Sequence, residues 1–117
     1  MTLRALILLA HGSRDARWRQ PFEQLRGRLG QGVYLAYLQF AQPDLATALG
    51  KARADGATEA VVVPAFMSGG GHLLRDVPDE VARAAAQVKG LTVTCTGALA
   101  EEPEVMDGMV EACRRLR

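Results

Sequence analysis

Four short apolar segments alternate along the chain with four stretches of helical periodicity. The segments 5–10, 33–38, 60–63 and 91–96 are rich in aliphatic or β-branched residues and have the length of strands. The first and third are continuously apolar, which is typical of parallel strands covered on both faces. The pattern therefore predicts a parallel sheet in which these two strands are central.

Between the strands, the apolar period changes to that of a helix with one buried face. The stripes are Trp18, Phe22, Leu25 and Leu29; Leu45, Ala48, Leu49 and Ala52; Val77, Val81, Ala84, Ala85 and Val88; and Val105, Met109, Cys113 and Leu116. Pro43, Pro78 and Pro103 are expected at or near helix starts, and Gly30 and Gly56 at helix ends. The order βαβαβαβα predicts one α/β domain over residues 1–117, a four-stranded parallel sheet flanked by helices on both faces.

Composition excludes several classes of protein. The length of 117 residues corresponds to one domain, and a net charge of +1 with 5% aromatic residues gives no reason to expect a nucleic-acid partner. The early apolar run 5–10 is shorter than the ~20 residues of a membrane span or the ~7–15 of a signal peptide. The two cysteines form no C-x-x-C motif. We therefore expect a cytoplasmic protein with no membrane partner.

The chain has two histidines, and each falls in a segment that follows a predicted strand. His11 comes directly after the first strand and His72 after the third. Open parallel sheets bind ligands at the carboxyl ends of their strands, so the two imidazoles are expected to converge if these strands are neighbours. Neutral imidazoles bind first-row metals and accept protons near neutral pH. The alternative is that each histidine caps a helix or packs a loop. For a third metal ligand, Asp15, Asp76 and water remain open.

The segment His11-Gly12-Ser13-Arg14-Asp15 is a compact turn from strand to helix. Gly12 allows the backbone to approach a ligand, and Ser13 is expected to cap the next helix or contact a ligand. Arg14 and Arg17 are placed to face an anion near the helix N-terminus, with solvent exposure as the alternative. Residues 1–30 hold six Arg against two acids, an excess that suits an anionic ligand.

The segment that follows the third strand contains three successive glycines, Gly69, Gly70 and Gly71. Such a stretch suits a lid, or a surface that lies against something flat or bulky. Phe66 and Met67 are expected in the core or in a pocket wall. Neither G-x-x-x-x-G-K-[ST] nor a G-x-G-x-x-G after the first strand is present, so nucleotide binding is disfavoured.

Together these segments resemble the small sirohydrochlorin chelatases, the short CbiX-type class II tetrapyrrole chelatases. The resemblance covers nearly the whole chain and rests on the segments 11–15, 36–45, 70–72 and 75–78. It implies a lyase that inserts cobalt or ferrous iron into sirohydrochlorin, on the route to cobalamin or sirohaem. It also implies that His11 and His72 are the metal ligands and proton acceptors, and that no cofactor is tightly bound.

The same resemblance implies a tetrapyrrole and a metal ion as partners of the protein. The expected substrate contacts are Ser13, Arg14, Arg17, Phe66, Met67, Ser68, Gly69, Gly70, Gly71 and Arg75. The sequence departs from many relatives at Gln39 and Gln42, where they have acids in the form L-E-L-A-E-P. A neutral amide is a weak ligand and no base. A non-catalytic metal or tetrapyrrole carrier is therefore the alternative, and a phospho-ligand module using the glycine-rich segment is a third.

The resemblance also implies how many copies of the chain associate. Larger chelatases contain two such halves and the short ones pair, so one half of 117 residues is expected to form a homodimer. Met106, Met109, Val110 and Cys113 give the last helix apolar residues on more than one side. This suits either a dimer surface or a deeply packed helix.

Overall fold

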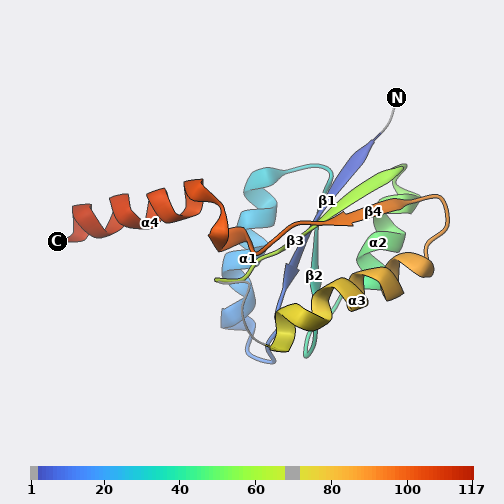
Figure 1. The fold of residues 1–117 in the computed structure, drawn as a ribbon, viewed down its shortest axis with the longest axis horizontal. Coiled ribbons are helices and arrows are strands. Elements are labelled where there is room, and N and C mark those ends of the chain that lie inside the picture. The colour runs from blue at the N-terminus through green and yellow to red at the C-terminus, as the bar shows by residue number, and fades with distance from the viewer. Residues whose placement is uncertain (1–2, 68–71) are drawn as a thin grey trace.

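The structure is a computed structural model that describes residues 3–67 and 72–117, with the side chains of 72–75 outside the described part. It contains a four-stranded parallel sheet of order β2-β1-β3-β4 (Figure 1). The strands are β1 (Arg4–Ala10), β2 (Val33–Tyr37), β3 (Glu59–Pro64) and β4 (Thr92–Cys95). Since β1 and β3 pair with each other in the middle, the predicted fold class and central strands are confirmed.

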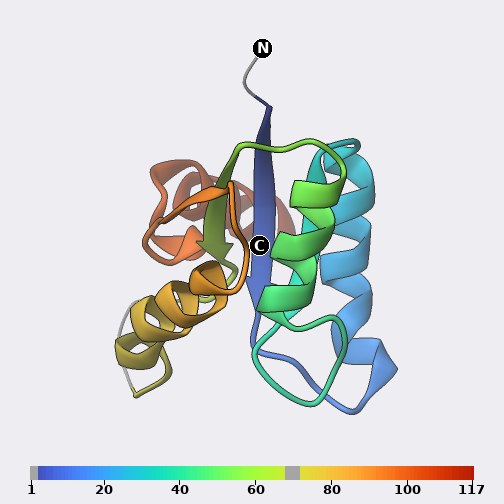
Figure 2. The same ribbon diagram turned by 90° about the vertical axis from the view of Figure 1, so that its right-hand side faces the viewer.

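Helices lie on both faces of this sheet. The described elements are α1 (Ala16–Leu29), α2 (Leu45–Ala54), α3 (His72–Ala86), the short 3-10 helix η1 (Leu99–Glu101) and α4 (Pro103–Leu116). Figures 1 and 2 show α2 and α3 together on one face, and α1 on the other. This is the arrangement that right-handed crossovers give when the chain runs from β1 to β2 and then back past β1 to β3.

The main core lies between the sheet and the α2–α3 layer. Ile7 and Leu9 of β1 and Val62 of β3 are fully buried there, with Leu49 of α2 and Val77 of α3. Each such aliphatic side chain contributes roughly 1.5–3 kcal/mol through burial. The α1 face is less enclosed, because α1 has no fully buried residue.

Two local predictions about the helices are wrong. The N-cap of α1 is Asp15, whose side chain accepts from Arg17 N at 2.9 Å, whereas the Ser13 hydroxyl accepts from Asp15 N at 3.1 Å, before the helix begins. Pro78 lies inside α3 rather than near its start. The apolar stripe from residue 77 marks only the part of α3 that packs on the sheet, and the helix itself begins at His72.

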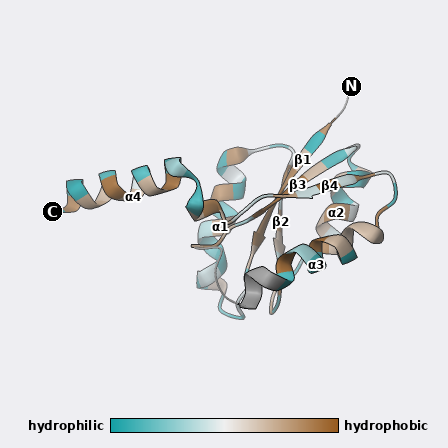
Figure 3. Cartoon of the chain, in the orientation of Figure 1, coloured by the Kyte–Doolittle hydropathy of each residue, from teal (hydrophilic) through white to brown (hydrophobic). Residues whose placement is uncertain are grey.

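Helix α4 stands away from the sheet (Figure 1). None of its residues is buried, so of the two alternatives for the last helix, a dimer surface or a deeply packed helix, the second is wrong. Figure 3 shows brown and teal residues alternating along its exposed length. None of the described helices has the length and apolarity needed to cross a bilayer.

Candidate active site

The loops that follow β1 and β2 run side by side at the carboxyl edge of the sheet. The hydrogen-bond ladder between the two strands continues past their ends, with Leu38 N donating to Ala10 O at 3.0 Å and Gln39 N to His11 O at 3.1 Å. Gly12 has a positive φ of 101°, and a Cβ there would overlap the carbonyl oxygen of Gln39. The close approach expected of Gly12 is therefore made to the neighbouring loop, which places His11 against Gln39.

His11 is half-buried and has a contact at each ring nitrogen. Its Nδ1 lies 3.3 Å from the Gly12 carbonyl oxygen, and its Nε2 lies 3.4 Å from Nε2 of Gln39. The carbonyl can only accept, which favours the tautomer with a proton on Nδ1. Nε2 then carries a lone pair directed at the Gln39 amide. This nitrogen is the atom of the described site that can bind a metal ion or take a proton.

A pocket of about 410 Å³ opens beside His11, between α1 and the carboxyl ends of the strands. Its apolar lining comes from Trp18 and Phe22 of α1, Tyr37 of β2 and Ala65 after β3. The volume lies within the range of small-molecule sites, roughly 300–1,000 Å³. Trp18 and Phe22 were predicted only as part of a helical stripe, and their place in a pocket wall was not predicted. The available signal was their position in the first two turns after the histidine loop.

Tyr37 contributes a polar atom to this otherwise apolar wall. The residue is 3% exposed, and its hydroxyl has no hydrogen-bond partner within the described part of the chain. Burial raises the pKa of the Tyr37 hydroxyl, and the nearby charge of Glu23 raises it further. The group is therefore a neutral donor at physiological pH, able to hydrogen-bond an acceptor on a molecule in the pocket.

Three arginines lie near the histidine loop, in different settings. The guanidinium of Arg14 lies 4.9 Å from the centroid of the Phe40 ring, a cation–π distance. Arg17 forms an exposed ion pair with Asp15 at 2.8 Å. Arg19, which was not predicted as a site residue, lines the pocket and donates to Ser13 O at 2.9 Å. Arg14 is thus placed at the edge of the site near Gln39, while Arg17 points at its own cap residue.

The Asp15–Arg17 pair also bears on the choice of a third metal ligand. Hydrogen bonds from the Arg17 side chain and backbone lower the pKa of Asp15, and the Asp15 carboxylate raises the pKa of Arg17. A carboxylate that already accepts from Arg17 through both oxygens is a poor partner for His11. Asp15 is therefore a poor candidate for the third metal ligand.

Phe40 stands out in the loop after β2. It adopts φ +64°, a left-handed conformation that is unfavourable for a residue with a bulky side chain, and it is 54% exposed. Strained residues of this kind cluster at functional sites. Phe40 directly follows Gln39, which contacts His11, so its exposed aromatic ring suits contact with a flat apolar ligand beside the site.

The segment after β3 is described as far as Met67. Phe66 is half-buried and packs against the core, in agreement with one of its two expected roles, whereas Met67 is 71% exposed and lines no described wall. Ser68, Gly69, Gly70 and Gly71 lie outside the described residues, as do the side chains of His72 and Arg75. The backbone places His72 as the first residue of α3, after a strand that pairs with β1. Convergence of the two imidazoles stays a prediction.

A complete metal site is not present in the described residues alone. Among them, no three His, Cys, Asp or Glu side chains gather at metal-binding distance. Cys95 and Cys113 are free and exposed.

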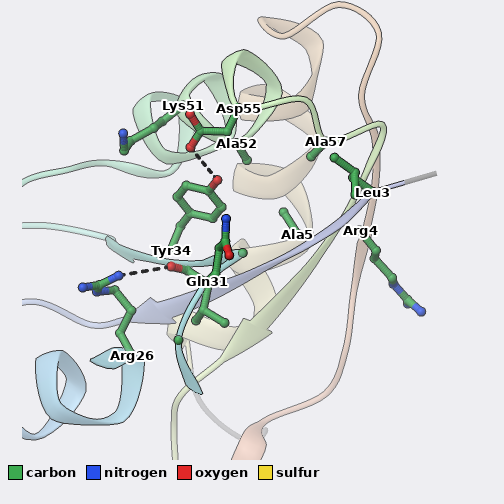
Figure 4. A pocket seen from close by; sticks show the side chains of 13 residues that line it. Leu3, Arg4, Ala5, Arg26, Gln31, Tyr34, Lys51, Ala52, Asp55 and Ala57 are labelled. Atoms are coloured by element: carbon green, nitrogen blue, oxygen red, sulfur yellow. Dashed lines mark hydrogen bonds between the residues drawn. The ribbon is translucent and has the colours of Figure 1, made fainter. Parts of the chain in front are cut away.

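A second pocket, of about 800 Å³, lies at the opposite edge of the sheet (Figure 4). There Tyr34 donates a hydrogen bond of 2.7 Å to Asp55, which raises the pKa of Tyr34 to about 12. Helices α1 and α2 both end at this edge, so their carbonyl ends face it and disfavour an anion. Ligands of open parallel sheets also bind at the other edge, so the pocket beside His11 is the candidate site.

The fold defines an α/β protein with a parallel sheet, and its candidate site is a pocket at the carboxyl edge of that sheet. The family model CbiX matches residues 5–116. The chain belongs to the CbiX family.

Curated relatives match part of the chain. A sirohydrochlorin cobaltochelatase of Saccharolobus islandicus strain L.S.2.15 is 33% identical over 76 residues, 62% of this chain and 59% of that relative. The one from Methanocaldococcus jannaschii is 31% identical over 81 residues, 65% of this chain and 57% of that relative. The chain thus spans less than two thirds of the length of these curated relatives.

Two crystal structures share the fold. A cobalamin (vitamin B12) biosynthesis CbiX protein from Marinobacter aquaeolei VT8 superposes with a TM-score of 0.85 at 32% identity, over 96% of this chain and 95% of that one. The sirohydrochlorin chelatase SirB of Bacillus subtilis subspecies spizizenii, solved in complex with cobalt, superposes with a TM-score of 0.81 at 22% identity. The match covers 98% of this chain and 51% of SirB, and it shows the fold alone.

The close approach of the Gly12 and Gln39 backbones leads to a prediction about stability. Gly12→Ala should lower the free energy of unfolding by at least about 2 kcal/mol, because a methyl group meets a backbone carbonyl at a positive φ. Gly27→Ala in α1 is the matched control, since nothing lies within 4 Å of its Cβ and it should be neutral or stabilising. Urea unfolding measures both. Equal stability of the two variants would contradict the close approach.

The contact between His11 and Gln39 leads to a prediction about metal affinity. Gln39→Glu should tighten Co²⁺ binding about tenfold, because it adds an anionic oxygen ligand beside Nε2 of His11. Gln31→Glu makes the same change at the opposite edge of the sheet and should leave affinity unchanged. Isothermal titration calorimetry with CoCl₂ compares them. An identical affinity in Gln39→Glu and wild type would show that Gln39 does not adjoin the metal position.

Proposed function

We propose that the protein inserts a divalent metal ion, cobalt or ferrous iron, into sirohydrochlorin. The observation that carries the proposal is the half-buried His11 at the carboxyl end of the central strand β1, with Nε2 directed toward the loop after β2. Family membership and the cobaltochelatase relatives support the choice of reaction and substrate. The metal ion is a substrate in this proposal, and no tightly bound cofactor is required.

The reaction must exchange two protons for one metal ion. Two pyrrole N–H bonds of the macrocycle break, the metal ion binds all four ring nitrogens, and both protons leave to bases or water. A histidine serves this exchange in two ways, because a neutral imidazole can hold the incoming metal and then accept a proton as the metal leaves. We assign this role to Nε2 of His11, with His72 as the second imidazole.

In the absence of substrates, the side-chain amide of Gln39 contacts Nε2 of His11. The 3.4 Å contact is long for a hydrogen bond between neutral groups, so a metal ion can displace the amide at little cost. The Nδ1 contact with the Gly12 carbonyl meanwhile holds the ring orientation. The Gly12 carbonyl therefore orients the imidazole ring, and displacement of the Gln39 amide makes Nε2 of His11 available to the metal ion.

The remaining candidate residues would bind the macrocycle. Arg14 offers a cation for a peripheral carboxylate, and the exposed ring of Phe40 offers an apolar face beside it. Of the residues expected from the sequence, Ser13, Ser68, Gly69, Gly70, Gly71 and Arg75 keep proposed substrate contacts. Arg17, Phe66 and Met67 keep weaker ones, since Arg17 is paired with Asp15 and Phe66 packs on the core.

The cellular setting belongs to the same proposal. We place the protein in the cytoplasm, as a homodimer whose second copy helps enclose the site. The α1 face, on which α1 has no buried residue, supports a second copy. A carrier of metal or tetrapyrrole without turnover is the competing function, favoured by the neutral Gln39 beside His11.

The test is metallation of sirohydrochlorin by Co²⁺ or Fe²⁺, followed by the change in absorption under anaerobic conditions. We expect catalytic turnover above the spontaneous rate for the wild type, and a loss of at least about 100-fold in His11→Ala, because removal of a metal ligand and base costs about that factor. Gln31→Ala, at the far edge of the sheet, should retain the wild-type rate.

Circular dichroism should show that His11→Ala retains the fold, since the histidine is only half-buried. Stoichiometric binding without turnover in the wild type would favour the carrier. Unchanged metallation in both His11→Ala and His72→Ala would rule out the proposed mechanism.

A further inference from the structure

The turn after β2 holds Phe40 in a backbone conformation that its side chain disfavours. The φ of Phe40 is +64°, in the left-handed region, where the Cβ of an L-residue comes too close to the following carbonyl oxygen. Glycine adopts this region without that cost. The turn is fixed on both sides of Phe40, because Gln39 N donates to His11 O at 3.1 Å and Tyr37 N donates to Pro43 O at 3.0 Å. The local backbone therefore favours a glycine where the chain has a phenyl ring.

Burial does not explain why the ring is there. Phe40 is 54% exposed, and the described hydrophobic core does not include it. Its contact is with Arg14, whose guanidinium carbon lies 4.9 Å from the centroid of the ring, within the range of a cation–π interaction. The two residues belong to different loops, which follow β1 and β2 and run side by side. A strained backbone that presents an exposed aromatic ring points to a function of the ring.

The charge of Arg14 is available to a ligand. No carboxylate pairs with Arg14 within the described part of the chain, whereas Arg17 is paired with Asp15 at 2.8 Å. An exposed arginine samples many rotamers, and contact with the Phe40 ring restricts them. An arginine restricted in this way loses less conformational entropy when it binds an anion. The ring thus positions the guanidinium.

This pair stands next to the nitrogen that we assign to the metal ion. Phe40 directly follows Gln39, whose amide nitrogen lies 3.4 Å from Nε2 of His11, and Arg14 follows His11 by three residues. A tetrapyrrole is far wider than this distance, so a macrocycle centred near Nε2 extends over the neighbouring residues. Its conjugated face suits a phenyl ring, and a carboxylate at its edge suits a guanidinium.

We propose that Phe40 and Arg14 act as one substrate-recognition pair. The exposed surface of the phenyl ring contacts the flat macrocycle, and the guanidinium that it positions binds a carboxylate at the edge of the macrocycle. The inference rests on the proposed function and adds Phe40 as a residue that determines affinity for the tetrapyrrole. It also accounts for the left-handed backbone, because the ring that lowers stability at this position strengthens substrate binding.

The experiment measures both the stability of the full chain and its affinity for metal-free sirohydrochlorin. Binding is followed by quenching of the emission of Trp18, the single tryptophan, which lines the pocket beside His11. Phe40→Gly should raise the dissociation constant at least ~10-fold, because an aromatic contact and its buried area are lost. The same variant should unfold at an equal or higher urea concentration, since glycine relieves the strain of the positive φ.

Two variants and one further measurement serve as controls. Phe40→Tyr keeps the ring and should bind sirohydrochlorin within about threefold of wild type. Leu29→Ala shortens a similarly exposed apolar side chain, 50% exposed at the other end of α1, and should leave the affinity unchanged. The Co²⁺ affinity of Phe40→Gly, measured by calorimetry without tetrapyrrole, should equal that of wild type, because a phenyl ring is no metal ligand.

A double-variant cycle tests whether the ring positions the guanidinium. Arg14→Gln should weaken sirohydrochlorin binding by about tenfold, through loss of a charge-assisted contact. The variant that combines Arg14→Gln with Phe40→Gly should lose clearly less than the product of the two single losses, since Arg14 is already unrestrained once the ring is gone.

Four results would each overturn the proposal: wild-type affinity for sirohydrochlorin in Phe40→Gly, a marked loss of stability in that variant, a parallel loss of its Co²⁺ affinity, or single losses that multiply in full. None of them affects the proposed function, provided that the wild type binds and metallates sirohydrochlorin. A wild type that does not bind sirohydrochlorin would overturn both.

Discussion

Strand β1 is hydrogen-bonded along both edges, to β2 on one side and to β3 on the other, and this shared pairing determines where the functional residues lie. The β1–β2 ladder continues into the following loops, which forces Gly12 against the carbonyl of Gln39. His11, one residue earlier, is thereby held at the carboxyl edge in a defined orientation. On its other side β1 pairs with β3, and the next element along the chain after β3 is α3, which begins at His72.

Much of this fold could be predicted from the sequence, because residues buried on both faces leave continuous apolar runs such as 5–10 and 60–63. The candidate site could be predicted only in part. His11 is visible as a rare residue after a strand, whereas its contact with Gln39 joins residues 28 apart and depends on backbone geometry. Trp18 belongs to the apolar stripe of a helix, a pattern that predicts burial in the core. Its place in a pocket wall depends on how α1 packs on the sheet, which the stripe does not reveal. Ser13 and Asp15 are both good caps, so sequence preference could not choose between them.

Helix α4 stands away from the chain's own sheet, and none of its residues is buried. The pocket beside His11 is lined by Trp18 and Phe22 of α1, a helix that has no buried residue of its own. The candidate site therefore lies on the less enclosed face of the sheet.

The central claim is that Nε2 of His11 holds the metal ion. A crystal structure of the protein soaked with Co²⁺, with data collected at the cobalt absorption edge, tests it most directly. We expect an anomalous peak about 2.1 Å from Nε2 of His11, a usual metal–imidazole distance, with the Gln39 amide turned away. An ordered cobalt ion found only elsewhere, at Cys95 or Cys113 for example, with His11 still against Gln39, would contradict it.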